Sequence, residues 1–140
     1  MIRTSLVATL LSLAPFATAI AQVTVPTCSC GGGTRLAASA INTLLGGNTV
    51  CAAVGSDQWQ EWHSGSNVVE VGNNPPDGEV VGVWSTSGTD ETDSLVTYAY
   101  GSGGSGGTYN YEVCQEGSAV HFCGATNVTN ASVVAGKGCP

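Results

Sequence analysis

The feature that most constrains this chain is its six cysteines, all of which follow an N-terminal export signal. Arg3 supplies a positive charge, Leu6–Ala14 an apolar stretch, and Ala19-Ile20-Ala21 a small-x-small cleavage site. We therefore expect residues 1–21 to be a cleaved signal peptide and the product to be secreted or periplasmic. Cysteines oxidise in such compartments, so the even count predicts a disulfide framework. The cysteines are Cys28, Cys30, Cys51, Cys114, Cys123 and Cys139.

The spacing of the cysteines limits how they pair. Cys28 and Cys30 lie too close for an easy mutual bond, so each is expected to reach a distant partner. We expect Cys51 to bond with Cys123, which would tie the start of the sheet to its last hairpin. The two remaining cysteines would then join the amino-terminal pair, leaving no free thiol.

Metal binding is the alternative use of these side chains. A tight hairpin over residues 115–120 would place Cys114 opposite His121, with Cys123 on the same face, and such a group can hold zinc. The acidic turns at 77–79 and 90–93 suggest calcium. Neither matches a known ligand spacing, so we expect disulfides, solvated acidic turns, no metal and no cofactor.

Length and charge bound the fold and its partners. The chain after the signal is long enough for one domain, which we divide into an extended arm over 22–33 and a single β domain over 34–140. Its basic residues are Arg35 and Lys137, against ten acids. Such a surface repels nucleic acid and anionic membranes. No apolar run after the signal reaches the roughly 20 residues of a membrane span.

One helix and many short strands are expected. Thr34 can cap a helix whose apolar residues recur at helical spacing up to Leu45, and Gly46-Gly47 ends it. Alternating runs predict strands at 49–54, 58–63, 68–71, 79–85, 95–100, 108–114, 119–123 and 127–134. The predicted fold is an all-β antiparallel barrel or strongly curved meander of seven or eight strands with one N-terminal helix. An orthogonal β-sandwich is the alternative.

Two strands flank the glycine-rich segment Gly101–Gly107, which we interpret as a long flexible hairpin loop. Side chains alternate across a strand, so Val96, Tyr98 and Tyr100 share one face of the first strand. By the same rule one face of the second strand carries Tyr109, Tyr111 and Val113. We expect the two faces to meet in cross-strand aromatic pairs.

Two resemblances rest on short motifs. Gly82-Val83-Trp84 resembles the glycine and tryptophan signature of lipocalin-like and avidin-like barrels, although in lipocalins it lies on the first strand. The order of LLGGNTVC, DQWQEWH, GVWS, VTYAYG, YNYEV and HFCG is similar to a group of small exported bacterial proteins without an established activity. The second resemblance implies export and fold, not function.

Catalytic groups are few. The histidines are His63 and His121, and no G-x-S-x-G nucleophile motif precedes a helix. A small secreted hydrolase that combines a carboxylate pair with either histidine is the alternative function, the pairs being Glu61 with Glu70 or Glu79 with Glu112. The simpler interpretation is that these acids are surface charges that keep the protein soluble.

The leading hypothesis is therefore a non-catalytic exported binding module. Trp59 and Trp62 lie three apart on one strand, so on a regular strand they face opposite sides, and one of them could be exposed. We favour the interpretation that both are buried in the core or covered by the amino-terminal arm. We expect binding to involve the 59–63 strand and the Gly101–Gly107 loop rather than a deep polar site. Candidate partners are a glycan, a small amphiphile or a basic protein surface. The candidate contacts are Trp59, Trp62, His63, Trp84, Tyr98 and Tyr100.

Overall fold

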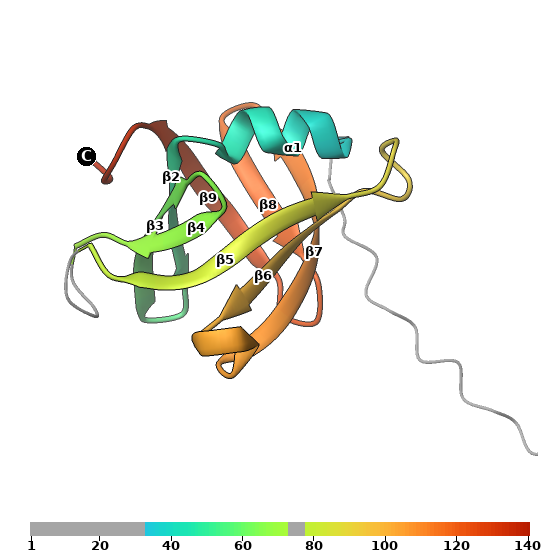
Figure 1. Cartoon of the computed structure of the whole chain (residues 1–140). Helices are drawn as coiled ribbons and strands as arrows, with labels where there is room; N and C mark the ends of the chain where they lie inside the picture. Colours follow the sequence, from blue (N-terminus) through green and yellow to red (C-terminus); the bar gives the residue numbers. More distant parts are fainter. Residues whose placement is uncertain (1–32, 73–77) are drawn as a thin grey trace, which may run out of the picture.

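In the residues that the structure describes, the protein is a closed antiparallel barrel of eight strands with one additional strand and one helix (Figure 1). The computed structural model describes residues 33–72 and 78–140. The predicted signal peptide, most of the predicted arm, and Cys28 and Cys30 lie outside these residues. The elements are β1 (Thr34–Arg35), α1 (Ala38–Leu45), β2 (Asn48–Val54), β3 (Asp57–Ser64), β4 (Asn67–Glu70), β5 (Val80–Ser87), β6 (Leu95–Tyr100), the 3-10 turn η1 (Ser102–Gly104), β7 (Gly107–Glu116), β8 (Ala119–Cys123) and β9 (Val128–Ala135).

The barrel is an up-and-down meander that closes on itself. Strands β2 to β9 pair in chain order, and β9 returns to pair with β2, where Val50 lies opposite Val133. Gly-Ser turns begin at Gly55, Gly65 and Gly117, each with φ near 60°. Glycine adopts positive φ without steric cost, so these tight turns force neighbouring strands to be antiparallel. The predicted strands are confirmed, and the sandwich alternative is not adopted.

Helix α1 covers one end of the barrel (Figure 1). Ile41 and Leu45 are both 0% exposed and belong to the core. The prediction that Thr34 caps this helix is wrong, because Thr34 pairs with Gln115 as part of β1. The hydroxyl of Ser94 instead accepts a 2.8 Å hydrogen bond from the Ala38 N–H. A residue 56 positions away in sequence therefore satisfies the start of the helix.

The end of α1 follows the prediction. The Gly46 N–H donates to the Asn42 carbonyl at 2.9 Å, and a Cβ on Gly46 would lie 2.8 Å from that oxygen. Glycine is therefore required by close approach at this position. The chain then enters β2 directly, which fixes α1 across the barrel end.

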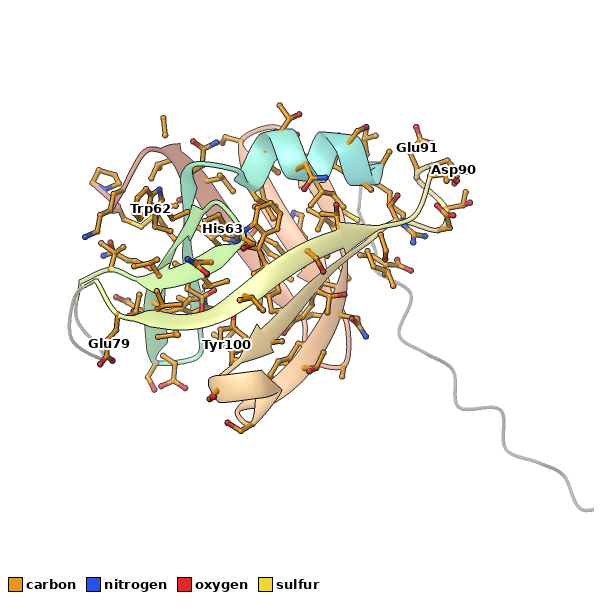
Figure 2. The ribbon with its side chains drawn as sticks, viewed as in Figure 1. Trp62, His63, Glu79, Asp90, Glu91 and Tyr100 are labelled. Atoms are coloured by element: carbon orange, nitrogen blue, oxygen red, sulfur yellow. A yellow bond between two sulfur atoms is a disulfide. The ribbon has the colours of Figure 1, made fainter. Side chains whose placement is uncertain are left out.

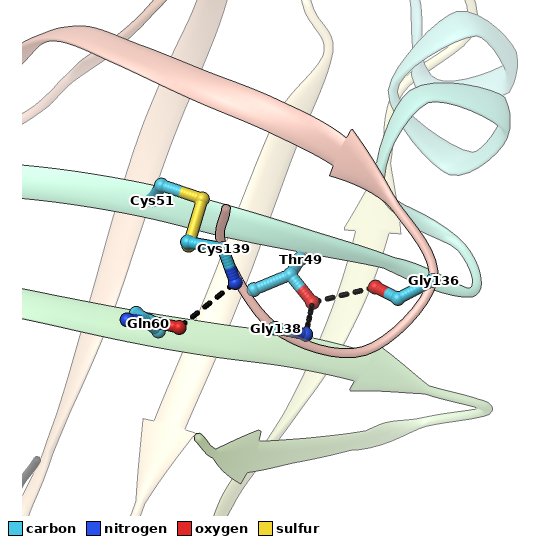
Figure 3. The surroundings of a disulfide bond; sticks show 6 residues. All are labelled: Thr49, Cys51, Gln60, Gly136, Gly138 and Cys139. Atoms are coloured by element: carbon cyan, nitrogen blue, oxygen red, sulfur yellow. Dashed lines mark hydrogen bonds between the residues drawn. A yellow bond between two sulfur atoms is a disulfide. The ribbon is translucent and has the colours of Figure 1, made fainter. Parts of the chain in front are cut away.

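A disulfide joins Cys51 to Cys139, so the predicted Cys51–Cys123 bond is wrong. The C-terminal tail explains the difference, because it returns alongside β2 and β3 (Figure 3). Thr49 Oγ1 donates to the Gly136 carbonyl at 2.6 Å and accepts from the Gly138 N–H at 2.9 Å, while the Cys139 N–H donates to Gln60 Oε1 at 2.9 Å. These bonds bring Cys139 to the outer face of β2.

The other described cysteines are also oxidised. Cys114 and Cys123 are each disulfide-bonded, and no cysteine of the described residues is free. The prediction that Cys139 joins the amino-terminal pair is wrong, since its partner is Cys51. The expected partner of Cys114, one cysteine of the amino-terminal pair, lies outside the described residues, and Cys123 does not bond with its expected partner, Cys51.

Candidate functional site: a pocket at the open end of the barrel

The barrel interior is a pocket at the end opposite α1. Its wall combines small aliphatic side chains, aromatic rings and one carboxyl group. The cavity volume is about 40 Å³, more than the roughly 10–15 Å³ that one water requires. It suits a few atoms of a ligand rather than a large molecule. The lining residues are Val50, Ala52, Trp59, Glu61, Tyr98, Tyr100, Tyr111, Phe122 and Val128.

Alternation along β3 decides which of its side chains reach this interior. Trp59 and Glu61 line the pocket, and His63, two residues further, is buried beneath it. Trp62 lies on the outer face, where its Nε1–H donates to the Gly47 carbonyl at 3.1 Å. The two tryptophans face opposite sides of β3, as strand alternation predicts, and both are half-buried rather than fully buried. Figure 2 shows His63 near α1 and Tyr100 toward the other end.

Glu61 is the polar centre of the pocket. The carboxyl is only 8% exposed, and the Tyr100 hydroxyl donates to its two oxygens at 2.9 and 3.0 Å. Burial raises the pKa of Glu61 to about 7; the Tyr100 hydrogen bond opposes this shift, and the charge of Glu70 adds to it. The described ion pairs join Arg35 to Glu112 and His121 to Glu116, so neither neutralises Glu61.

Below Glu61, His63 and Tyr98 form a buried polar pair. His63 is 0% exposed, and its Nε2 lies 2.9 Å from the Tyr98 hydroxyl. Burial lowers the pKa of His63 to about 4, while hydrogen bonds to main-chain groups of Glu61 and Asn48 oppose the shift. Burial also raises the pKa of Tyr98. Both side chains are therefore neutral at pH 7, and His63 has no exposed surface.

Aromatic side chains form a continuous wall from the floor of the pocket to its rim. Tyr98 stacks on Tyr100 with ring centroids 6.0 Å apart, and contacts Tyr111 edge-on at 6.0 Å. Tyr100 contacts Tyr109 at 5.8 Å, and Tyr109 is 41% exposed. In the strand register Tyr98 lies opposite Tyr109. The predicted cross-strand aromatic pairing of β6 with β7 is confirmed.

The loop between β6 and β7 lies at the same end of the barrel (Figure 1). It is compact: the Gly106 N–H donates to Tyr100 at 2.8 Å and the Gly101 N–H to Val81 at 2.8 Å. The expected hairpin connection is confirmed, and η1 gives it an ordered turn. A Cβ on Gly107 would lie 2.8 Å from the Tyr109 hydroxyl, so this glycine makes room for the ring at the rim.

The predicted contact residues fall in three places. Trp59, Tyr98 and Tyr100 line the pocket. His63 and Trp84 are buried in contact below it, with ring centroids 5.0 Å apart, and the Trp84 indole donates to the Gly65 carbonyl at 2.9 Å. Trp62 is outside the barrel. The prediction did not include Phe122 or Val128, which also line the pocket; their alternation with outward-facing residues was the sequence feature that could have indicated them.

The prediction that the candidate carboxylates are surface charges does not hold for all of them. Glu61 and Glu70 are opposite each other in the register and are 8% and 5% exposed, so the surface interpretation is wrong for both. Burial raises the pKa of Glu70, and a hydrogen bond from the Gln60 main chain opposes this shift. Glu70 lines a separate outer groove of about 330 Å³ beside Gln58, Gln60 and the Cys51–Cys139 bond. Only Glu61 reaches the interior pocket.

The zinc alternative is wrong. Cys114 does lie opposite His121, as predicted, but Cys114 and Cys123 are disulfide-bonded and offer no thiolate. His121 Nδ1 accepts from the Asn130 N–H at 3.2 Å. Among residues 33–72 and 78–140, no group of three or more histidine, cysteine, aspartate or glutamate side chains is placed to hold a metal.

The acidic turn between β5 and β6 has a structural role. Asp93 Oδ1 accepts from the N–H groups of Thr89 and Asp90, and Asp90 Oδ1 accepts from the Thr92 N–H and hydroxyl. Hydrogen bonds lower the pKa of both carboxyls. Figure 2 shows Asp90 at the tip of this turn, far from Tyr100. The turn positions Ser94, whose hydroxyl donates to the Asp90 carbonyl at 2.6 Å and holds α1.

No protein-family model, curated protein or solved structure matches this chain. Within the part of the chain that the structure describes, no helix is long and apolar enough to cross a membrane.

Proposed function

We propose that this protein is a non-catalytic exported binding module that takes a small ligand into the open end of its barrel. The observation that carries the proposal is Glu61, a buried carboxyl in a pocket walled by aromatic rings. A concave apolar site with a few oriented polar groups is the usual form of a small-molecule site. Export is supported by the N-terminal sequence pattern and by the oxidised cysteines.

The chemistry of the pocket favours binding over hydrolysis. Glu61 and Glu70 are neighbours in the register, but Glu70 lines the outer groove and does not share the pocket. His63 is buried and paired with Tyr98, and His121 lies on the outer side near Asn130. A carboxylate pair that flanks a substrate would have to open onto one cavity.

The size and polarity of the pocket discriminate between the three candidate partners, a glycan, a basic protein surface and a small amphiphile. A glycan or a protein surface would require an exposed platform, whereas this pocket is narrow and mostly aromatic. A small amphiphile fits it best, with a polar group at Glu61 and an apolar part along Tyr98, Tyr100 and Phe122.

Native mass spectrometry of the mature protein tests the proposal. The protein is incubated with small-molecule extracts of the source culture, and retained adducts are detected. Ala52→Leu fills the pocket, while Ala53→Leu adds the same atoms on the exposed side of β2. We expect the adduct on wild type and Ala53→Leu but not on Ala52→Leu. An adduct that survives Ala52→Leu and is lost from Ala53→Leu would assign binding to the outer groove instead.

A further inference from the structure

We propose that the ligand of this pocket is a small organic ammonium ion, whose charged head meets Glu61 and whose carbon skeleton lies along the aromatic wall. The inference rests on the proposed function, because it names the chemical class that the same site takes.

The first support is a carboxyl with unused acceptor capacity. A carboxylate has about four lone-pair sites, and the described contacts of Glu61 are the two from the single Tyr100 hydroxyl. Burying a charge without a partner is costly. The described lysine and arginine side chains lie elsewhere, since Arg35 pairs with Glu112 at 3.1 Å and Lys137 is exposed on the tail. A cation supplied by the ligand would complete the site.

The aromatic wall is the second support. The faces of aromatic rings carry negative potential, so rings around a carboxylate add to its attraction for a cation. Trp59, Tyr98 and Tyr100 line the same pocket as Glu61. Once such a site is desolvated, each favourable cation–ring contact contributes roughly 0.5–2 kcal/mol.

Charge excludes the opposite class of ligand. The lining contains no lysine, arginine or histidine, so an anion would meet Glu61 with no compensating charge in the wall of the pocket. The chain as a whole carries a formal net charge of −7. The overall field therefore draws cations toward the protein and raises their encounter rate.

The cavity also sets the size of the head group. A volume of about 40 Å³ admits a primary ammonium and its first carbons, and the remainder of the ligand would extend past Tyr109 at the rim. A bulky quaternary head would have to displace the rings. Short alkyl or aryl ammonium ions are therefore the expected ligands.

Proton linkage gives the proposal a distinctive signature. Around Glu61 the titratable groups are Tyr98 and Tyr100 on β6, Tyr111 on β7, Glu70 on β4 and His63 on β3. Burial raises the pKa of each tyrosine, so these hydroxyls stay neutral near pH 7. A bound cation favours ionised Glu61, and binding should therefore release a proton below pH 7.

Isothermal titration calorimetry with three probes of similar shape tests the class. Phenethylammonium carries the cation, 2-phenylethanol is the neutral analogue and phenylacetate the anion. We expect phenethylammonium to bind about tenfold tighter than the alcohol at pH 8, and about tenfold tighter at pH 8 than at pH 6. Phenylacetate should not bind.

Variants complete the test. Glu61→Gln should remove the preference for the cation and its pH dependence, whereas Glu79→Gln, which deletes an equal charge at an exposed position outside the pocket, should keep both. Equal or tighter binding of the alcohol or of phenylacetate overturns the ammonium class. If that binding is lost in Ala52→Leu, the barrel site itself stands. Absence of binding by all three probes also overturns the inference, while the extract experiment judges the binding function separately.

Discussion

The two ends of the barrel are built from the same strands, yet they differ in the side chains that fill the interior. Beneath α1 the interior is filled by aliphatic side chains such as Ile41, Leu45, Val68 and Val96, all 0% exposed. At the other end Tyr100 and Tyr111 are only partly buried, and Glu61 is enclosed among rings. The packed end supplies stability, and the open end holds a buried carboxyl whose burial costs stability.

This division follows from where the chain places its helix. Close packing in the core depends on every gap being filled, and α1 provides the side chains that fill one mouth of the barrel. Nothing comparable enters the other mouth among the described residues, where the hairpin loop of η1 lies beside the opening (Figure 1). The cavity is therefore what remains when a small barrel is closed at one end only.

The strongest test of the division removes a side chain at the packed end. Leu45→Ala should lower the free energy of unfolding by about 2–5 kcal/mol, because it leaves a cavity beneath α1. Tyr109→Ala at the open rim should cost less than about 1 kcal/mol, since that ring is already 41% exposed. Urea denaturation under non-reducing conditions measures both. Equal costs would mean that the two ends contribute alike.

Substitution of Glu61 should have the next largest effect on the free energy of unfolding. Its pKa of about 7 in the folded protein exceeds the value of 4.5 for a free carboxyl, so the folded state binds more protons between these limits. The contribution of Glu61 to stability is therefore lost as pH rises from about 4.5 to 7. Glu61→Gln should be more stable than wild type by up to about 3 kcal/mol at pH 8 and by little at pH 4.

His63 has the opposite effect on the pH dependence of stability, and the two effects together determine how the stability of the wild-type protein varies with pH. Its folded pKa of about 4 lies below 6.5, so protonation of the unfolded chain destabilises the protein as pH falls from about 6.5 to 4. The two effects offset each other in wild type between about pH 4.5 and 6.5. In Glu61→Gln the rise of stability with pH should become visible in urea denaturation at pH 4, 6 and 8. Glu79→Gln, at an exposed acid, is the charge control, and an identical response in both variants would contradict the role of burial.

Local patterns predicted the strands because each is an alternating run bounded by a turn. Ala119–Cys123 and Leu95–Tyr100 were placed with their observed bounds. The start of α1 was wrong because a tertiary contact overrode a local one: Thr34 joined β7, and Ser94 took over the helix start.

The site and the disulfide depended on non-local choices. Alternation placed Glu61 on the same face as Trp59, but only barrel closure shows that this face is interior. The pairing of Cys51 with Cys139 depends on how the tail folds back onto Thr49 and Gln60. Local sequence does not specify that path, so the prediction that Cys51 bonds with Cys123 was wrong.

The two tryptophans of β3 allow a comparison of an interior and an exterior side chain on the same strand, measured by the effect of each on ligand affinity. Trp59→Ala should weaken binding of the pocket ligand roughly tenfold, because it deletes part of the aromatic wall. Trp62→Ala should leave affinity unchanged, since that indole contacts Gly47 on the outer face. Calorimetry with phenethylammonium, or with any ligand recovered from extracts, measures the difference after near-UV circular dichroism confirms folding. Loss of affinity in Trp62→Ala alone would move the site to the outer face.

The smallest expected effect is on the pKa of Glu61, which the Tyr100 hydroxyl at the open end influences. The Tyr100 hydroxyl is the described hydrogen-bond donor to Glu61, and this bond lowers the pKa that burial raises. Tyr100→Phe keeps the ring and removes the donor, so the pKa of Glu61 should rise above 7 by roughly half a unit to one unit, as the loss of about 1 kcal/mol implies. Carbon-detected NMR of the Glu61 carboxyl against pH gives the midpoint directly. Tyr109→Phe alters a rim hydroxyl that does not bond Glu61 and should leave the midpoint in place. A midpoint that falls in Tyr100→Phe would mean that the hydroxyl stabilises the protonated acid instead, and the affinity of the cation would then rise rather than decline in that variant.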